Sequence, residues 1–272
     1  MTAMTTEQAL KQALNRALKR AAGGAALMAL AACGGGGTAT DLVVTPTPTA
    51  TTLNASQLQG RWVTGSGVSP ARTALVVPSA SGSASMVAWV LSADFKGAAR
   101  LSVSTSGSNQ VSGQGSRYTP GVQGSAQAAS YSGVADVQAN TLSLGGDLPT
   151  LNRVDRLDGA TSAAAAAGNW SSSANDGAVK IQWAVDSTGR MSATSSTGCS
   201  YSGALASLAG TVYEASLSET CPNSSGGSST LNFKGVGSLR VAQASAPAAL
   251  TLLVLSTADN GATALAFGLQ PQ

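Results

Sequence analysis

The residue types that most enzymes use for chemistry are scarce in this 272-residue chain. It contains no histidine, which excludes Ser-His-Asp and Cys-His nucleophile activation and removes the commonest general base. The same absence removes the most frequent ligand of zinc, copper and haem iron. No lysine after the N-terminal region has a serine three residues before it, and no glycine-rich phosphate motif with lysine is present. We therefore expect no enzyme, no metal and no cofactor.

Two pairs of carboxylates lie close together in the sequence, Asp155 with Asp158 and Glu214 with Glu219. A glycosidase needs two carboxylates that face one cleft, and spacing along the chain does not establish this. We interpret all four as solvated charges at strand ends. A carboxylate-based hydrolase is therefore the least favoured of the three functions considered.

The first 32 residues have the three parts of a bacterial signal peptide. Residues 1–20 carry four basic side chains and one acidic one, and residues 21–30 form an uncharged apolar core too short to span a bilayer as a helix. The whole chain has 15 basic and 12 acidic residues, so the part from Cys33 onward keeps 11 of each and has no net charge. No basic patch argues for a nucleic-acid partner.

The segment Leu30-Ala31-Ala32-Cys33 resembles the lipobox of bacterial lipoproteins, which is a branched aliphatic residue, two small residues and a cysteine. This resemblance implies cleavage before Cys33, lipid on its thiol, acyl chains such as palmitate, and a membrane partner held through that lipid. Gly34 stands where an aspartate can signal inner-membrane retention in enteric bacteria. By the same resemblance we expect a lipid-anchored protein of the bacterial cell envelope, at the outer membrane.

Residues 33–52 combine glycines with a Thr-Pro repeat, a composition typical of a flexible tether. The body that follows carries Gly-x-Trp twice, ending at Trp62 and at Trp170, 108 positions apart. This recurrence predicts an internal repeat, with β domain 1 at residues 53–160 and β domain 2 at residues 161–272.

Alternation of apolar and polar residues dominates both halves and indicates strands that are buried on one face. Residues 179–185 form such a strand, and residues 186–190 form the turn that ends it. Residues 250–255 are almost continuously apolar, and Asn260-Gly261 suits a tight hairpin into a strand at residues 264–269. The pattern predicts an all-β protein with two tandem antiparallel β-barrel or sandwich domains.

Once Cys33 is acylated, Cys199 and Cys221 are the cysteines that are left. In an exported protein such a pair is expected to form a disulfide. The alternation on both sides fits a hairpin centred at Gly210, which puts positions 199 and 221 directly opposite each other. A redox-active pair is the competing interpretation, but such pairs normally have closer spacing, as in Cys-x-x-Cys.

The two Gly-x-Trp segments resemble the start of the first strand in the lipocalin and avidin barrels, where the glycine clears the turn and the tryptophan closes the barrel end. The resemblance implies structural roles for Trp62 and Trp170 and an arginine packed against tryptophan, for which Arg240 and Arg156 are the candidates. As a whole, the repeated body behind a lipobox is similar to uncharacterised envelope lipoproteins of Gram-negative bacteria, a resemblance that brings no activity with it.

The function we favour is a non-enzymatic, membrane-anchored envelope lipoprotein with a binding or structural role. The alternative is a carrier of a small apolar ligand inside a β-barrel cavity. An apolar pocket of about 300 Å³ or more within a barrel would favour the carrier. The sequence does not identify the protein or small molecule that would be bound.

Overall fold

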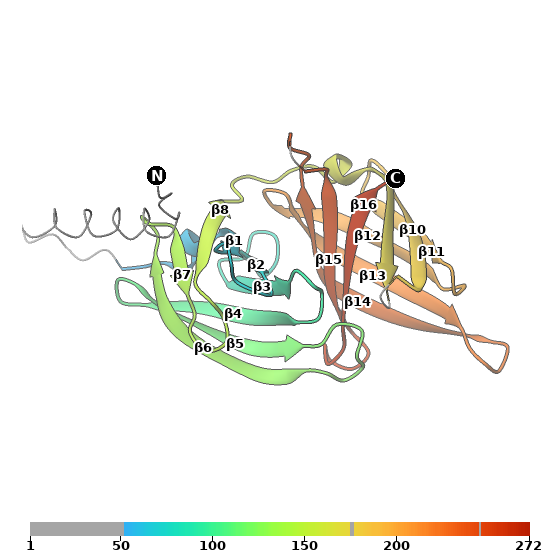
Figure 1. The fold of residues 1–272 in the computed structure, drawn as a ribbon, viewed down its shortest axis with the longest axis horizontal. Coiled ribbons are helices and arrows are strands. Elements are labelled where there is room, and N and C mark those ends of the chain that lie inside the picture. Colours follow the sequence, from blue (N-terminus) through green and yellow to red (C-terminus); the bar gives the residue numbers. More distant parts are fainter. Residues whose placement is uncertain (1–51, 175–176, 245) are drawn as a thin grey trace, which may run out of the picture. The chain divides into compact units, whose positions relative to one another are not determined.

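The computed structural model describes residues 52–174, 177–244 and 246–272, all of which belong to the compact unit Thr49–Gln272. They form two closed antiparallel barrels of eight strands each, so the expected all-β class is confirmed and its barrel form applies (Figure 1). The expected signal peptide, Cys33 and the expected tether up to residue 51 lie outside the described residues. Within the described ranges, no helix has the length and apolar character needed to cross a bilayer.

Barrel 1 is a meander in which each strand pairs with the next and β8 closes on β1. The 3₁₀ helix η1 (Ala55–Leu58) precedes it. The strands are β1 Gly60–Thr64, β2 Arg72–Pro78, β3 Met86–Ser92, β4 Ala98–Ser106, β5 Gln110–Tyr118, β6 Gln127–Asp136, β7 Thr141–Ser143 and β8 Leu151–Asp155. Every second side chain points inward, and these build a core around Trp62, Leu101 and Leu151.

Barrel 2 repeats this plan, with the 3₁₀ helix η2 (Ala163–Ala166) before its first strand and β16 closing on β9. Its strands are β9 Gly168–Ala174, β10 Val179–Val185, β11 Arg190–Ser195, β12 Ser200–Ala209, β13 Val212–Pro222, β14 Ser228–Arg240, β15 Ala249–Ser256 and β16 Ala264–Pro271. Trp183, Tyr201 and Phe267 meet inside it with ring centroids 5.3–6.0 Å apart. The division expected near residue 160 falls between β8 and β9.

Both barrels begin with the same local arrangement. The indole Nε1 of Trp62 donates to the carbonyl oxygen of Leu58 at 2.9 Å, and that of Trp170 donates to the carbonyl oxygen of Ala166 at 3.1 Å. In each case the acceptor is the last residue of the preceding 3₁₀ helix. Gly60 has a φ of +156°, and a Cβ there would lie 2.7 Å from a backbone oxygen of β8. A side chain at Gly60 would therefore clash with β8, whereas a Cβ at Gly168 would make only ordinary contact with the Trp170 ring, at 3.6 Å.

The sequence interpretation is wrong about which arginine packs against a tryptophan. Neither Arg240 nor Arg156 takes this place. The guanidinium carbon of Arg153 instead lies 4.4 Å from the ring centroid of Trp62. The cause is the register of β8 on β1, which pairs these two residues directly. Among the described residues, no cation lies over the ring of Trp170 in the same way.

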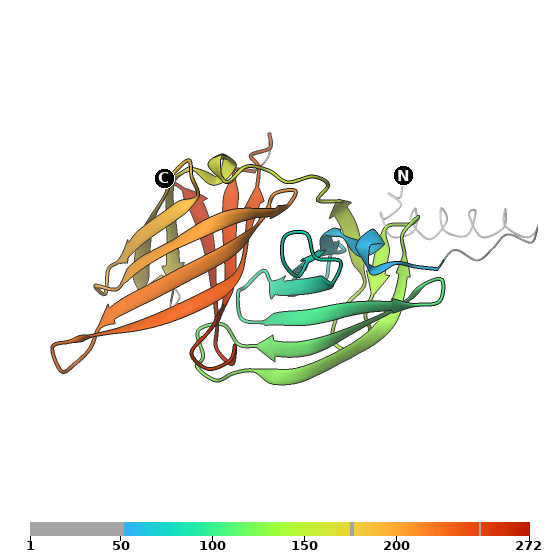
Figure 2. The same ribbon diagram turned by 180° about the vertical axis from the view of Figure 1, so that it is seen from behind.

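The disulfide between Cys199 and Cys221 is confirmed, with Cα atoms 4.1 Å apart. The predicted pairing is also correct, because Ser200 on β12 faces Thr220 on β13. Beyond the disulfide the β13–β14 hairpin extends past its neighbours, since β14 pairs with β15 only from Phe233 onward (Figure 2).

The prediction of a tight hairpin at Asn260-Gly261 is wrong, because the loop is longer than predicted. Both residues have positive φ as expected, 54° and 80°, but the loop runs over residues 257–263. The carboxylate of Asp259 accepts hydrogen bonds from the backbone N–H of Ala262 at 3.0 Å and from the hydroxyl of Thr263 at 2.5 Å. These bonds hold the wider loop together.

Candidate functional site

The two barrels meet through the outer faces of β1–β5 in barrel 1 and β12–β16 in barrel 2. Strands β2, β3 and β15 are buried on both faces, because their inward residues fill a barrel and their outward residues contact the other barrel. This explains why residues 250–255 are apolar except for Thr251, which lines the cleft between the barrels. These outward residues form one buried group, the inter-barrel cluster, with residues of neighbouring strands and of the segment after β8. The cluster consists of Leu75, Val77, Val87, Trp89, Ala98, Tyr118, Leu157, Ala209, Val212, Val236, Leu253 and Ala264.

Hydrogen bonds surround the inter-barrel cluster. The backbone N–H of Ser81 donates to Oε1 of Glu214 at 2.8 Å, and the backbone N–H of Gly124 donates to Oγ1 of Thr263 at 2.9 Å. The backbone N–H of Gly121 also donates to the carbonyl oxygen of Ala264 at 2.8 Å. An apolar centre with a polar rim is the usual anatomy of a specific interface.

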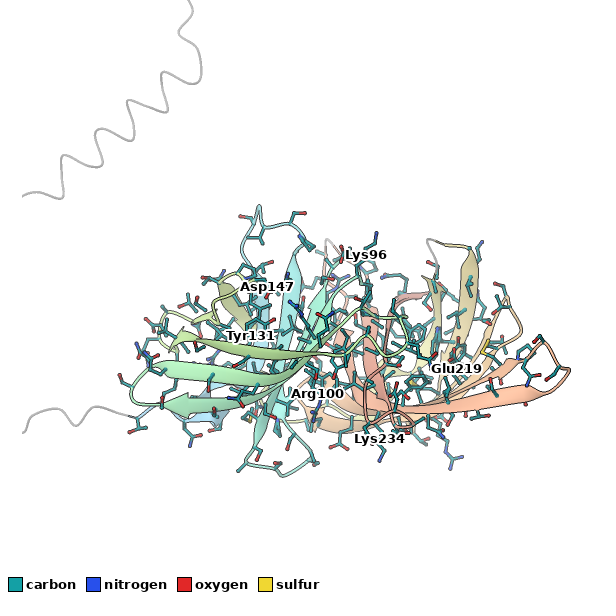
Figure 3. The ribbon with its side chains drawn as sticks, turned by 90° about the horizontal axis from the view of Figure 1, so that it is seen from below. Lys96, Arg100, Tyr131, Asp147, Glu219 and Lys234 are labelled. Atoms are coloured by element: carbon teal, nitrogen blue, oxygen red, sulfur yellow. A yellow bond between two sulfur atoms is a disulfide. The ribbon has the colours of Figure 1, made fainter. Side chains whose placement is uncertain are left out.

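Between these faces lies a cleft of about 770 Å³. Leu75, Trp89 and Leu91 line it from barrel 1, and Val236 and Leu253 line it from barrel 2. The Trp89 ring also lies under the guanidinium of Arg100 on β4, whose carbon is 5.4 Å from the ring centroid (Figure 3 labels Arg100). The volume falls within the usual range for small-molecule sites, about 300–1,000 Å³.

The cationic wall of the cleft comes from Arg61, which follows Gly60 and points outward while Trp62 points into the barrel. Its Nη2 donates to Oγ1 of Thr211 at 3.0 Å and to the carbonyl oxygen of Leu239 at 3.1 Å, so it links β1 to barrel 2. Since both bonds use Nη2, the N–H groups of Nε and Nη1 have no partner among the described residues.

The charges around Arg61 are incompletely balanced. Burial lowers the pKa of Arg61; the carboxylate of Asp155 opposes this and the guanidinium of Arg240 reinforces it. Within the described part of the chain, no carboxylate lies at ion-pairing distance from Arg61. Arg61, Arg240 and Asp155 are the charged residues that line the cleft, which leaves one positive charge in excess.

Ser238 on β14 supplies a second unusual feature of the cleft lining. Its side chain is 5% exposed, and its Oγ has no hydrogen-bond partner among the described residues. A buried hydroxyl without a partner costs stability, so each such group in a native structure calls for an explanation. Ser238 directly precedes Leu239, whose carbonyl oxygen accepts a hydrogen bond from Arg61. The unpartnered hydroxyl and the guanidinium therefore lie in the same part of the cleft.

The β3–β4 turn places an aromatic ring at the edge of the cleft. Phe95 has a φ of 59°, which is rare for a bulky residue, and its ring packs where a Cβ on Gly268 would lie 2.7 Å away. The turn is fixed by Asp94, whose Oδ1 accepts from the hydroxyl of Ser92 at 2.5 Å and from the backbone N–H of Lys96 at 3.1 Å. The hydrogen bond from Ser92 is the main cause that lowers the pKa of Asp94.

A smaller cavity of about 260 Å³ opens at the end of barrel 1 formed by the β1–β2, β3–β4, β5–β6 and β7–β8 turns. Arg72 and Asp147 form an ion pair there, with 3.7 Å between nitrogen and oxygen. The hydroxyl of Tyr131, which points in from β6, donates to Oδ1 of Asp147 at 3.1 Å (Figure 3). Burial, and then the negative charge of Asp147, raise the pKa of Tyr131.

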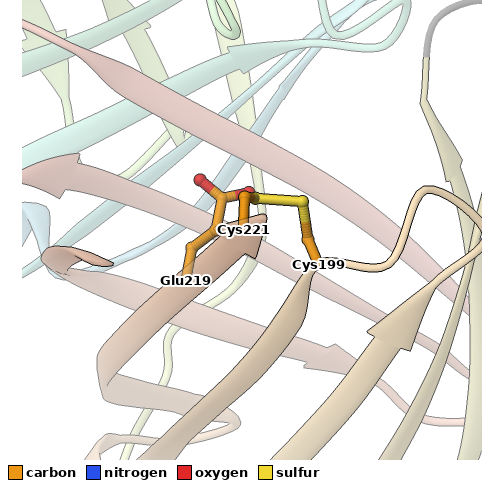
Figure 4. A group of neighbouring side chains, drawn as sticks. All are labelled: Cys199, Glu219 and Cys221. Atoms are coloured by element: carbon orange, nitrogen blue, oxygen red, sulfur yellow. A yellow bond between two sulfur atoms is a disulfide. The ribbon is translucent and has the colours of Figure 1, made fainter. Parts of the chain in front are cut away.

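Cys199, Glu219 and Cys221 place three potential metal-binding atoms within 4.8 Å of one another. Figure 4 shows the carboxylate of Glu219 beside the disulfide. Both sulfurs are committed to the disulfide, so neither offers the thiolate that a metal would bind. Glu219 instead faces Tyr201 across the strands, and burial followed by its hydrogen bond to Glu219 raises the pKa of Tyr201.

The carboxylate pairs singled out in the sequence are not brought to a common site. Glu214 and Glu219 are five residues apart on β13 and therefore face opposite sides of the strand. Asp155 lines the cleft and accepts from the backbone N–H of Leu157 at 3.0 Å, whereas Asp158 is exposed and lines none of the cavities described above.

The cleft residues Arg61, Trp89 and Ser238 were not identified from the sequence. Continuous apolar runs at residues 74–77 and 86–91 were the signal that could have revealed a sheet face buried outside the barrel. Nothing in the sequence marks Ser238. Comparison with known proteins finds no protein-family model, no curated protein and no solved structure that significantly matches this chain.

Proposed function

We propose that this chain is a non-enzymatic, lipid-anchored envelope protein that binds a small molecule in the cleft between its two barrels. The observation that carries the proposal is the 770 Å³ cleft, whose walls combine buried apolar side chains with the incompletely paired Arg61. A few polar groups on a mostly apolar concave surface are typical of small-molecule sites. The lack of histidine and the separation of the carboxylate pairs favour binding over catalysis.

Occupancy of the cleft can be tested with Nile red, a neutral dye that fluoresces in apolar surroundings. The protein is the full chain carrying Cys33→Ser, so that no acyl chain of its own competes for the cleft. Thr251 is half-buried on β15 and lines the cleft, so Thr251→Trp should fill it and abolish the dye signal. Ser192→Trp, on an exposed position of β11, is the matched control and should leave the signal unchanged. Equal dye binding by both variants would reject the cleft as the site.

The alternative, a ligand carried inside a barrel, is supported by the smaller cavity at the mouth of barrel 1, which reaches Val90, Ala99 and Tyr131. Its 260 Å³ falls below the usual lower limit for ligand pockets, about 300 Å³, so we favour the cleft. Ala99→Trp would fill this mouth. Loss of dye binding in that variant, with normal binding by Thr251→Trp, would favour the alternative.

The lipid anchor of the proposal depends on the lipobox at residues 30–33, with Cys33 as the acylated residue. Cells that express the chain are grown with a fatty-acid analogue, and the label is expected on the wild-type protein and absent from Cys33→Ser. Label on both proteins would reject acylation at Cys33. Outer-membrane location rests on Gly34, and recovery of the labelled protein in the inner-membrane fraction would contradict it.

A further inference from the structure

We infer that the ligand of the inter-barrel cleft is an amphiphile with a single anionic head, of the carboxylate type, and an apolar tail. This inference rests on the proposed function and specifies the chemical class of its ligand. The head would lie against Arg61 and Ser238, and the tail along Trp89 and Leu253.

A preference for an anion follows from Arg61. A guanidinium has five N–H donors, and the two on Nη2 are engaged with Thr211 and Leu239. The other three have no partner among the described residues, although the side chain is half-buried. A carboxylate matches this unpaired edge in charge and in planar geometry.

The charge of the head follows from the balance within the lining. Arg61 and Arg240 contribute two positive charges and Asp155 one negative charge. One excess positive charge complements a monoanion, whereas a dianion would leave a negative charge in a partly desolvated site.

The hydroxyl of Ser238 provides the second contact for the head. It lies next to the residue whose carbonyl accepts from Arg61, and its Oγ finds no partner in the described protein. A ligand oxygen beside Arg61 would supply that partner after rotation about one side-chain bond. The unsatisfied group would then be used on binding, which accounts for its cost in the free protein.

The tail follows from the rest of the lining. Leu75 and Trp89 are 7% and 8% exposed, and Val236 and Leu253 are 3% and 4% exposed, yet all four border the cleft. Because these side chains are already almost fully covered, the apolar gain on binding would come from removing the surface of an alkyl or aryl tail from water against this wall.

The test compares two probes with the same chain, octanoate and octan-1-ol, on the full chain with Cys33→Ser. Binding is measured by isothermal titration calorimetry and by displacement of Nile red. We expect octanoate to bind at least about tenfold more tightly than octan-1-ol, the scale of one charge-assisted hydrogen bond. Arg61→Gln should weaken octanoate by on the order of 10- to 100-fold and leave octan-1-ol nearly unchanged. The same substitution on barrel 2, Arg190→Gln at an exposed position, should change neither affinity.

Arg61→Gln could disturb the fold, because Arg61 also donates hydrogen bonds to Thr211 and Leu239 of barrel 2. Ser238→Ala is therefore a second, independent test of the contact with the ligand head. This variant removes a hydroxyl that has no partner, so it should fold normally, yet it should weaken octanoate by roughly three- to tenfold. Equal binding of octanoate and octan-1-ol would overturn the inference of an anionic head. An octanoate affinity that neither Ser238→Ala nor Arg61→Gln changes would overturn it as well. Nile red binding that Thr251→Trp abolishes would still support the proposed function in that case. Absence of cleft-dependent dye binding would reject both.

Discussion

Leu253 provides a sharp test of whether the two barrels act as one packed unit. Its side chain points away from the core of barrel 2, but it is only 4% exposed because barrel 1 covers it. Burial of a leucine contributes about 1.5–3 kcal/mol, and truncation at well-packed sites costs about 2–5 kcal/mol. We therefore expect Leu253→Ala to lower the free energy of unfolding by about 2–3 kcal/mol. On a separate barrel the same position would lie on the surface, where substitutions change stability by about 0.5 kcal/mol or less.

The measurement is urea unfolding of the full, non-reduced chain, followed by circular dichroism and by tryptophan fluorescence. Leu231→Ala on β14 is the matched control, because it makes the same chemical change at a position that is 43% exposed. Val77→Ala tests the same contact from barrel 1, because Val77 is a fully buried outward residue of β2. It should lower the free energy of unfolding by about 1 kcal/mol or more. If the losses for Leu253→Ala and Leu231→Ala agree within about 0.5 kcal/mol, the packing of barrel 1 over Leu253 is refuted.

Three further predictions concern stability. Replacing Cys199 and Cys221 together with alanine removes a link across 22 residues and should cost about 3 kcal/mol in urea melts; an unchanged midpoint would contradict this. Hydrogen bonds, first from the hydroxyl of Thr188, lower the pKa of Asp186 in the folded state. The contribution of Asp186 to the free energy of unfolding is therefore fully present above the ordinary pKa of 3.8 and is lost as pH falls through the lowered folded-state pKa. The stability difference between wild type and Asp186→Asn should therefore be constant from pH 7 to about pH 5 and shrink below about pH 4, and a difference that grows in acid would refute the sign. Arg153→Met should cost about 0.5–2 kcal/mol through loss of its cation–π contact, whereas the exposed Arg156→Met should be nearly neutral in the same thermal melts, and equal losses would show that the contact is not responsible.

The sequence determined the features that depend on near neighbours along the chain. Alternation marked strands such as residues 179–185, because one face of each strand is buried. The turn at residues 186–190 is built by its own side chain, since Asp186 accepts from the backbone N–H groups of Thr188 and Arg190. The disulfide partners followed from the register of a single hairpin, which is set locally by its turn.

Only the tertiary structure decided which residues from distant segments meet. Arg153 reaches Trp62 because the barrel closes, bringing together strands some 90 residues apart in sequence. The length of the loop after β15 depended on the side chain of Asp259, and the choice between barrel and sandwich depended on the pairing of β8 with β1 and of β16 with β9. The cleft itself exists because the outer faces of β1–β5 and β12–β16 pack together. Alternation predicts that a strand has a buried face, but when both faces are apolar it does not specify what covers the outer one.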